Sequence, residues 1–379
     1  MSVDSYLTLP VAALKQAGGY WTAREISQQP QIWRQVTAEH QPRSAALQQF
    51  LQPLLAKPLL RIILTGAGTS AYIGQALAAH LQQQLQPGQR VEAIATTDLV
   101  SNPTSYLDPA LPTLLVSYGR SGNSPESVAA VELAEQLVPG CRHLLITCNS
   151  QGKLAQFSQH DPERCYLYAL PDATHDQSFA MTSSFSSMYL ATLLTFAPDN
   201  THLQQLINGA EQLLQHRLAE IKQQAETPCR RMVFLGSGPL QAIAREAALK
   251  YLELTSGQIL SHYESPLGFR HGPKSLVDAD TQVLVLQSSD AYTSRYDLDL
   301  LAELQRDQKA LRLDLLSEQQ LLGSSSLPDA WLGLLLILWC QALACFKSMQ
   351  LGISPDNPCP GGQVNRVVQG VTLYPFVKA

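Results

Sequence analysis

Short apolar runs alternate with longer helical patterns along most of this sequence. The runs are rich in Leu, Ile and Val and lack polar alternation, which is typical of parallel strands covered on both faces. In the first half the pattern predicts strands at 62–64, 91–96, 113–117, 144–147 and 165–169, and helices at about 70–84 and 125–137. Repeated strand–helix units favour an α/β fold built on an open parallel sheet with right-handed crossovers.

The second half repeats this organisation. Strands are expected at 232–235, 281–287 and 310–315, and helices near 240–254, 294–308 and 330–351. In both halves a strand runs into a Gly-x-Gly turn, and Gly66 and Gly68 precede Gly236 and Gly238 by 170 residues. Two such turns at domain-sized spacing indicate a duplicated unit.

The segments outside these halves, which we place at 45–200 and 227–354, have their own patterns. Residues 1–44 are expected to form a helical extension without strands, in which Thr22 would cap a helix over 21–26. The Gln- and Leu-rich stretch 201–226 has helical spacing and predicts one linking helix. The tail, 355–379, begins with a stretch that is too rich in Pro and Gly for regular structure.

Composition excludes several classes of protein. The chain has 379 residues, 45% of them hydrophobic and 15% charged, so it is neither disordered nor collagen-like. The net charge is −5 and no run of five basic residues occurs, which argues against nucleic acid as a partner. Seven cysteines without a C-x-x-C pair indicate neither a disulfide framework nor a zinc ribbon.

The apolar segments do not predict a membrane protein. The start of the sequence has an acidic residue early and no basic region before an apolar core, so we do not expect a signal peptide. The longest apolar run, 331–346, is interrupted by Gln341 and is shorter than about 18 uninterrupted residues. We interpret it as a buried helix and expect a cytoplasmic protein.

The loop at 117–127 carries the densest set of anion-binding groups. It follows a buried strand and precedes a helix, where backbone N–H groups and the helix dipole favour an anion. Its side chains add a cation, an amide and hydroxyls, namely Arg120, Ser121, Asn123, Ser124 and Ser127. The alternative is a helix-capping loop with incidental serines.

The turn Gly66-Ala-Gly-Thr-Ser70 is a shorter site of the same kind. It lacks both the third glycine of a dinucleotide fold and the Gly-Lys of a P-loop. Thr69 and Ser70 could serve only as helix caps. Together with the other loop, however, they would enclose one anion in the crevice at the carboxyl ends of the strands. The expected ligand is therefore small and phosphorylated.

Candidate catalytic residues lie in the second half. Lys250 and Glu253 are three residues apart on one helix face, where a surface ion pair is the alternative interpretation. His271 lies in the loop Arg270-His-Gly-Pro273, and a single histidine in a loop is often incidental. No cluster has the spacing of metal ligands, so we expect neither a metal nor another cofactor.

These segments together resemble the sugar isomerase (SIS) domain family. The matching pieces are Gly66-Ala-Gly-Thr-Ser70, Ser121-Gly122 with Ser124, Asp176-Gln-Ser-Phe-Ala-Met-Thr-Ser-Ser-Phe185, Ala248-Leu-Lys-Tyr-Leu-Glu253 and Arg270-His-Gly-Pro273. The resemblance covers roughly 45–379 and implies two tandem SIS domains, at 45–200 and 227–354, each an open parallel sheet with helices on both faces.

The resemblance also implies roles for particular residues. By comparison with the isomerase half of glucosamine-6-phosphate synthase, the phosphate would be held by the turn and the loop, that is by Gly68, Thr69, Ser70, Arg120, Ser121, Asn123 and Ser124. Glu253 would shuttle the proton, Lys250 would assist it and His271 would open the sugar ring. The 176–185 segment would close the sugar pocket, and the tail would close the active site. In that relative the histidine reaches the neighbouring subunit, which implies a homodimer.

Several departures point to one branch of the family. Gly119 and Arg120 replace the usual residues, Ser124 replaces a threonine, and Gln369 stands at the comparable place of the synthase's imine-forming lysine. The 119–127 loop and the 365–370 segment resemble the AgaS group, which implies deamination and isomerisation of galactosamine 6-phosphate to tagatose 6-phosphate. The alternatives are an aldose–ketose isomerase that releases no ammonia and a non-catalytic sugar-phosphate regulator.

Overall fold

The chain forms two compact units, and each unit is built from segments that are not consecutive in the sequence. The computed structural model describes residues 4–323 and 327–377. The unit that we call the β3 unit comprises Gln31–His175, Ser183–Pro198 and Gly362–Ala379. The β8 unit comprises Met1–Pro30, Asp176–Thr182 and Asp199–Gly361. A seven-residue piece from the middle of the chain therefore belongs to the β8 unit, and the tail belongs to the β3 unit.

The β3 unit is built on a five-stranded parallel sheet, as the apolar runs predict. Its strands are β3 (Arg61–Thr65), β4 (Arg90–Ala93), β5 (Thr113–Gly119), β6 (Arg142–Thr147) and β7 (Cys165–Ala169). The strands lie in the order β4-β3-β5-β6-β7. Every residue of β3 and β5 is buried, because helices cover both faces of the sheet.

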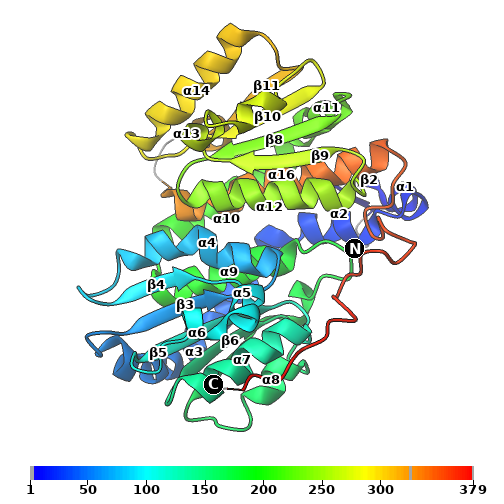
Figure 1. The fold of residues 1–379 in the computed structure, drawn as a ribbon. Coiled ribbons are helices and arrows are strands. Elements are labelled where there is room, and N and C mark those ends of the chain that lie inside the picture. Colours follow the sequence, from blue (N-terminus) through cyan, green and yellow to red (C-terminus); the bar gives the residue numbers. More distant parts are fainter. Residues whose placement is uncertain (1–3, 324–326, 378–379) are drawn as a thin grey trace. The chain divides into compact units, whose positions relative to one another are not determined.

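Helices of the β3 unit cover its sheet on both sides (Figure 1). They are α3 (Gln29–Leu55), α4 (Thr69–Gln82), α5 (Thr96–Ser101), α6 (Pro103–Tyr106), α7 (Pro125–Leu137), α8 (Lys153–Phe157), the 3₁₀ turn η1 (Asp172–Thr174) and α9 (Ser183–Phe196). Helices α5 and α7 pack with Ile63, Leu115 and Leu145 of the sheet in one apolar cluster. Helices α4 and α9 pack together on the opposite face.

The β8 unit repeats the plan with a four-stranded parallel sheet. Its strands are β8 (Arg231–Gly236), β9 (Leu260–Glu264), β10 (Thr281–Leu286) and β11 (Arg312–Leu316), in the order β11-β10-β8-β9. Its helices are α10 (Asn200–His216), α11 (Leu218–Glu226), α12 (Pro239–Leu254), α13 (Pro266–Phe269), the 3₁₀ turn η2 (Pro273–Leu276), α14 (Thr293–Asp307), α15 (Glu318–Leu322) and α16 (Asp329–Gln350). The amino-terminal elements β1 (Ser5–Tyr6), β2 (Leu9–Pro10), α1 (Val11–Ala17) and α2 (Tyr20–Ser27) complete the unit.

Helix α16 is the central helix of the β8 unit. All its residues from Ala330 to Ser348 are buried, and it packs against α2, α10, α11 and α12. Among the described residues it is the one helix long and apolar enough to cross a membrane. Its most apolar stretch lies entirely inside the protein, as we expected of a buried helix. The core helix of a protein can be as long and as apolar as a helix that crosses a membrane.

The two Gly-x-Gly turns have the same backbone geometry, which supports the duplication inferred from their spacing. Gly68 has φ +54° and ψ −127°, and Gly238 has φ +56° and ψ −128°. Each precedes the first residue of a helix, α4 after β3 and α12 after β8, and these two strands are the first of their parallel sheets in chain order. This backbone region is open almost only to glycine, so both turns need a glycine at this position.

Several expectations about local structure were wrong. A short β1–β2 hairpin lies in the amino-terminal segment, where we expected no strand. Thr22 is not a cap, because α2 already begins at Tyr20 and Gly19 precedes it. The Thr22 N–H and hydroxyl instead donate to Asp356 Oδ1, each at 2.8 Å. The predicted linking helix is two helices, α10 and α11, that meet at Arg217.

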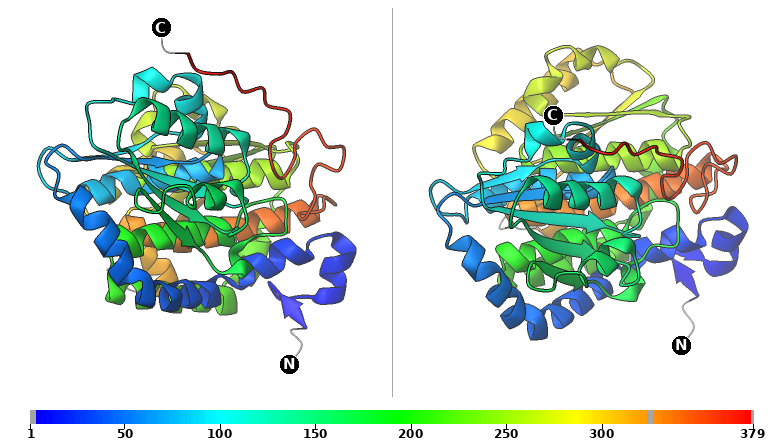
Figure 2. Two further views of the ribbon diagram at one scale, coloured as in Figure 1. Left: turned by 90° about the horizontal axis from the view of Figure 1, so that it is seen from below. Right: turned by 60° about the horizontal axis from the view of Figure 1, so that its bottom comes forward.

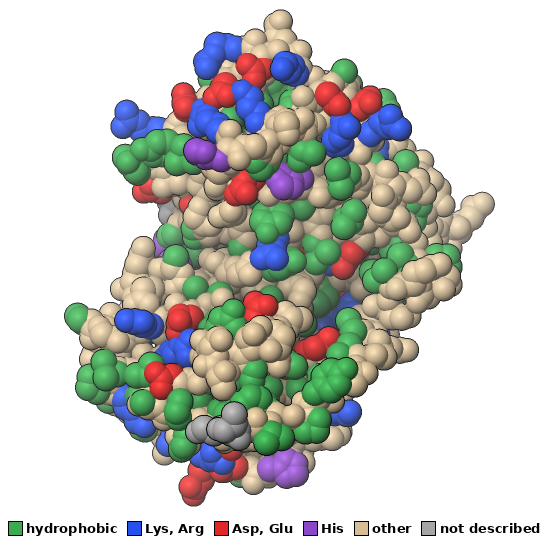
Figure 3. Space-filling view, in the orientation of Figure 1, with side chains coloured by type: hydrophobic (Ala, Val, Ile, Leu, Met, Phe, Trp, Pro, Cys, Tyr) green, Lys and Arg blue, Asp and Glu red, His purple; other side chains and the backbone are tan. Residues whose placement is uncertain are grey.

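Charged side chains of both signs are interleaved over the α14 side of the β8 unit (Figure 3). Asp299 and Glu303 of α14 pair with Arg270, at 2.7 Å each. Lys274 also pairs with Glu303 and, at 2.6 Å, with Asp307. Because these charges compensate one another locally, this face carries no field of a single sign.

Candidate active site

The first candidate for anion binding is the turn between β3 and α4. Thr69 and Ser70 are the first two residues of α4, and each is only 5% exposed. The residue before the helix is Gly68, which has no side chain, so the interpretation of Thr69 and Ser70 as caps was wrong. The Thr96 N–H donates to the Gly66 carbonyl at 2.9 Å, which ties the start of α5 to this turn.

The second element is the loop between β5 and α7. Ser124 is the cap of α7, because its Oγ accepts a hydrogen bond from the Ser127 N–H at 3.3 Å. Asn123 Oδ1 accepts from the Lys153 N–H at 2.9 Å, and Ser121 Oγ accepts from the Asn123 N–H at 3.2 Å. The capping interpretation therefore holds for Ser124, while a phosphate contact by the same hydroxyl stays a prediction.

These two elements leave the sheet at the same edge. β3 and β5 are hydrogen-bonded parallel neighbours, with Thr65 opposite Ser117 at their carboxyl ends. The chain goes from β3 to β4 on one side and then to β5 on the other, so the connections diverge between β3 and β5. Ligands of open α/β sheets bind in the crevice at such a switch point. The structure therefore brings Gly68–Ser70 and Arg120–Ser124 to the expected place.

Arg120 contacts the carboxyl-terminal tail. Its side chain is buried, with 7% exposed, and Nη2 donates to the Arg366 carbonyl at 2.6 Å. The tail, drawn in red in Figure 2, continues as an extended segment over helices of the β3 unit. Gln136 Nε2 of α7 donates to the Phe376 carbonyl at 3.1 Å, and the Phe376 ring packs against the apolar cluster of α5 and α7.

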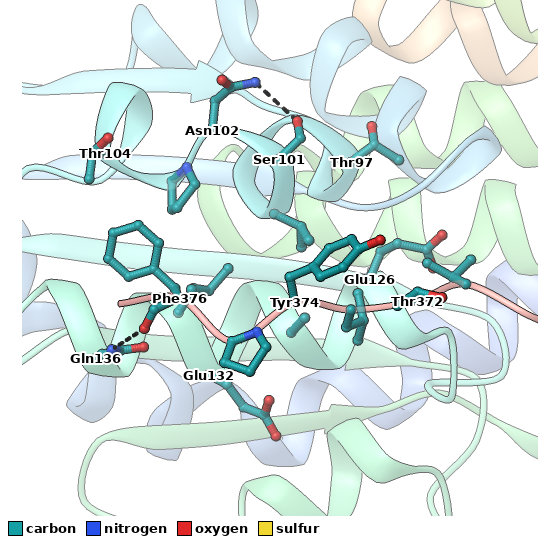
Figure 4. Close-up of a pocket in the computed structure, with 17 residues that line it drawn as sticks. Thr97, Ser101, Asn102, Thr104, Glu126, Glu132, Gln136, Thr372, Tyr374 and Phe376 are labelled. Carbon is teal, nitrogen blue, oxygen red and sulfur yellow. Dashed lines mark hydrogen bonds between the residues drawn. The ribbon is translucent and has the colours of Figure 1, made fainter. Parts of the chain in front are cut away.

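The tail lines a groove of about 1040 Å³ together with α5, α6 and α7 (Figure 4). Thr97 and Glu126, near the starts of α5 and α7, lie at the end where Thr372 passes. Phe376 lies toward the other end, beside Gln136 and Thr104. The groove thus extends along α7 from the helix end that follows the 117–127 loop.

The catalytic candidates Lys250 and Glu253 lie on α12 of the β8 unit. The Lys250 Nζ donates to Glu253 Oε2, as the spacing of three residues predicts. Lys250 is 1% exposed and Glu253 is 23% exposed, so the pair is not the surface ion pair of the alternative interpretation. A buried ammonium thus holds a carboxylate that still reaches the protein surface.

The sequence analysis missed a third member of this group, Glu246. Its side chain is fully buried, and its Oε1 lies 3.6 Å from Lys250 Nζ. Glu246 is four residues before Lys250, so the same helical spacing that related Lys250 to Glu253 also places Glu246 on this face. Two carboxylates share one ammonium, and removing Lys250 would leave the fully buried Glu246 without this compensating charge.

His271 is placed differently. It follows α13, its side chain is exposed, and its N–H donates to the Gly268 carbonyl at 2.9 Å. The neighbouring Arg270 is fixed to α14 by Asp299 and Glu303, which holds the base of the loop. The phosphate candidates all lie in the β3 unit, and Lys250, Glu253 and His271 all lie in the β8 unit.

The comparison with known proteins identifies the family. The SIS domain pattern matches residues 54–198 and 227–315. The chain belongs to the SIS domain family. It is 65% identical, over 99% of its length and 97% of the relative's, to D-galactosamine-6-phosphate deaminase AgaS of Shewanella sp. (strain ANA-3).

Solved structures of SIS proteins agree with the fold described above. Tagatose-6-phosphate ketose/aldose isomerase from Escherichia coli is 42% identical, with a TM-score of 0.86 over 99% of this chain and 100% of that one. Glucosamine-6-phosphate deaminase from Thermotoga maritima is 21% identical, with a TM-score of 0.66 over 92% and 99% of the two chains. The second likeness concerns the fold alone. The expected tandem α/β fold is therefore confirmed.

Proposed function

We propose that this SIS protein deaminates and isomerises a 2-amino-2-deoxyhexose 6-phosphate, with galactosamine 6-phosphate giving tagatose 6-phosphate and ammonia. The observation that carries the proposal is the 65% identity to the Shewanella deaminase along nearly the whole chain. The buried Lys250 beside the partly exposed Glu253 supplies a base of the kind that the reaction needs.

The phosphate binds at the carboxyl edge of the β3 sheet. Thr69 and Ser70 begin α4, and Ser121, Asn123 and Ser124 precede α7, so both groups lie at helix amino-terminal ends that favour an anion. Gly68 admits the close approach of the phosphate, since it has no side chain. Arg120 adds positive charge and, through the Arg366 carbonyl, connects the loop to the tail.

The proton moves through Glu253. Its carboxylate takes the proton from C2 of the open-chain amino sugar and returns it to C1. One amine proton passes to the C1 oxygen, so that the C1 carbonyl becomes a hydroxymethyl group and a C=N bond forms at C2. Water hydrolyses that bond and releases ammonia and the ketose phosphate. Lys250 holds the carboxylate in place, and such positioning of a general base is effective because the proton transfer then needs little reorganisation.

His271 opens the sugar ring, and we place it in the active site of a neighbouring subunit of a homodimer. Its exposure at the end of α13 supports this assignment, since an exposed side chain is available to a second copy. The tail and the 176–185 segment close the sugar pocket. Domain boundaries near 45–200 and 227–354, the linking segment between them and a cytoplasmic location are part of the same proposal.

A second candidate is aldose–ketose isomerisation without release of ammonia. The 42% identity to the tagatose-6-phosphate ketose/aldose isomerase of Escherichia coli favours it. The same proton shuttle on a 2-hydroxy sugar gives a ketone, and nothing leaves from C2.

The ammonia formed per sugar consumed distinguishes the two reactions. Galactosamine, glucosamine and N-acetylated 6-phosphates are offered in turn to enzyme pre-treated with a chelator, without glutamine. We expect one ammonia per galactosamine 6-phosphate, together with tagatose 6-phosphate. Interconversion of tagatose 6-phosphate and an aldose, with no ammonia from any amino sugar, would contradict the deaminase and leave the isomerase.

A further inference from the structure

The segment Asp176–Thr182 is held by a different unit from its sequence neighbours. Residues on both sides of it belong to the β3 unit, while the segment itself belongs to the β8 unit. Its seven described residues form neither helix nor strand. Its conformation therefore depends on side-chain and backbone contacts made within the β8 unit.

Glu25 of α2 accepts several hydrogen bonds from the start of this segment. Its carboxylate accepts from the backbone N–H groups of Gln177 and Ser178, the latter at 3.3 Å to each oxygen. It also accepts from the Ser178 hydroxyl. Glu25 is only 3% exposed, so these bonds form away from water, where an unsatisfied donor is costly.

A turn near the end of the β8 unit holds the middle of the segment. The Phe179 N–H donates to the Asp356 carbonyl oxygen at 3.2 Å. The Asp356 carboxylate accepts from the N–H groups of Trp21 and Thr22, at 3.0 and 2.8 Å, and so caps α2. The same helix that carries Glu25 is thus fixed to the turn that holds Phe179.

The segment also closes on itself. Asp176 is fully buried, and its Oδ2 accepts from the Thr182 N–H at 2.8 Å while Oδ1 accepts from the Thr182 hydroxyl at 3.3 Å. Asp176 therefore holds the two ends of the segment together. The start of the segment is bonded to Glu25 of α2, and its middle is bonded to the Asp356 carbonyl. Glu25 is the side chain that joins the amino-terminal helices to this loop.

We infer that Glu25 is a positioning residue that sets the conformation of the 176–182 loop, so that the amino-terminal helices determine how tightly the sugar is held. The effect on the sugar rests on the proposed function, in which this loop closes the sugar pocket. Glu25 acts through the loop, because its carboxyl group bonds to the Gln177 and Ser178 N–H groups and to the Ser178 hydroxyl.

The inference predicts that a change at Glu25 weakens binding of the sugar and leaves binding of the phosphate unchanged. In Glu25→Ala the loop N–H groups lose their acceptor, so we expect faster hydrogen exchange at 177–182 and a KM for the sugar phosphate about 10-fold higher. The inhibition constant of inorganic phosphate, which reports the β3-unit turn and loop, should stay within about twofold.

Glu25→Gln should restore most of this function. The amide oxygen can still accept from the Gln177 N–H, and the amide nitrogen can donate to Ser178 Oγ. The Ser178 hydroxyl can then donate to the Ala180 carbonyl, which lies 3.1 Å away. If Glu25→Ala does not fold, Ser178→Ala removes the bond from the Ser178 hydroxyl to Glu25 and should raise exchange and KM to a smaller extent.

The matched control is Glu318→Ala. Glu318 is also 3% exposed and belongs to the same unit, and its Oε1 accepts a backbone N–H, that of Leu327, at 2.8 Å. This control should lower stability without raising exchange at 177–182 or KM. Equal exchange of the loop in Glu25→Ala and Glu318→Ala would overturn the inference. Because exchange is measured without substrate, the result stands even if wild-type enzyme forms no ammonia and the proposed function fails.

Discussion

At the scale of single residues, the environment of Lys250 supports the proposed role of Glu253 in proton transfer. The ammonium is almost completely buried and lies between a fully buried carboxylate and a partly exposed one. The charge of Glu246 offsets part of the free energy needed to bury the Lys250 ammonium. Glu253 contacts the same ammonium and remains partly exposed. Glu253, and not the fully buried Glu246, is therefore the carboxylate that a molecule from solvent can meet.

Glu253→Gln tests the proposed base. The amide keeps the shape of the side chain but cannot accept a proton, so kcat should fall by about 10²–10⁴-fold. The mutant should remain folded and should bind sugar phosphate, which calorimetry can measure. A folded Glu253→Gln protein with near-normal turnover would exclude Glu253 and direct attention to Asp176.

Ser121 and Ser124 should differ when each is changed to Ala. Both should raise KM, by about 10-fold or more, because a hydrogen bond to a charged group contributes ~1.5–3 kcal/mol. Ser124 also caps α7, so only Ser124→Ala should lower the free energy of unfolding as well, by about 1 kcal/mol.

The measurements are steady-state kinetics and denaturant titration of both variants. Unchanged kinetics in the double variant would remove the phosphate from this loop. If both variants lose the same free energy of unfolding, the cap that Ser124 provides for α7 does not contribute to stability.

At the scale of elements, the turns between β3 and α4 and between β8 and α12 decide where these two helices begin. Both turns use a glycine with positive φ, at Gly68 and Gly238. A Cβ at either position would meet no atom within 4 Å, so the requirement for glycine is one of backbone conformation and not of space.

Gly68→Ala and Gly238→Ala form a matched pair. Each should lower the free energy of unfolding of its unit by about 1–3 kcal/mol, the usual cost of such a backbone conformation in a residue with a side chain. Only Gly68→Ala should also raise KM, because Thr69 and Ser70 follow it, whereas Pro239 and Leu240 follow Gly238. A comparable rise of KM in Gly238→Ala would contradict the assignment of the phosphate to the first turn.

The elements that the sequence predicts well are those whose signal is local. The buried strands and the helices that follow them were predicted to within a few residues, because uninterrupted apolar runs and glycine turns mark them. Strand β9 was missed because its five residues, from Leu260 to Glu264, are all partly or fully exposed and lack an apolar pattern. The predicted β4 extended too far, since α5 already begins at Thr96.

The same distinction applies to the candidate site. Lys250 and Glu253 could be paired from spacing on one helix, and Glu246 could have been found by extending the same pattern. The contacts that hold the 176–182 loop could not be predicted from the sequence. Glu25 lies about 150 residues before its partners in the loop, and Asp356 lies more than 330 residues after Thr22. No pattern within a helix or strand indicates contacts at such separation.

At the scale of the whole molecule, Glu25 should make stability depend on pH. Burial, and then the negative charge of Asp176, raise the pKa of Glu25 from 4.5 to about 8. Between these values the folded protein keeps a proton that the unfolded chain has lost. The free energy of unfolding should therefore fall as the pH rises from about 4.5 to about 8, and change no further through this group above that range.

Thermal unfolding across this pH range, compared between wild type and Glu25→Gln, measures the effect. The variant lacks the titrating group, so its unfolding temperature should vary less between pH 5 and 8. If the two profiles are parallel, Glu25 does not hold the proton. Two units are present, so each transition needs its own assignment before the profiles are compared.

The paired glycine turns have a consequence for how many ligand molecules one chain holds. The backbone of the turn occurs twice, but the two hydroxyls that follow Gly68 are replaced after Gly238 by a ring without an N–H and an apolar side chain. The second copy keeps the geometry that starts a helix and has lost the groups that would bind an anion. A calorimetric titration with sugar phosphate should accordingly give a stoichiometry of one per chain and not two.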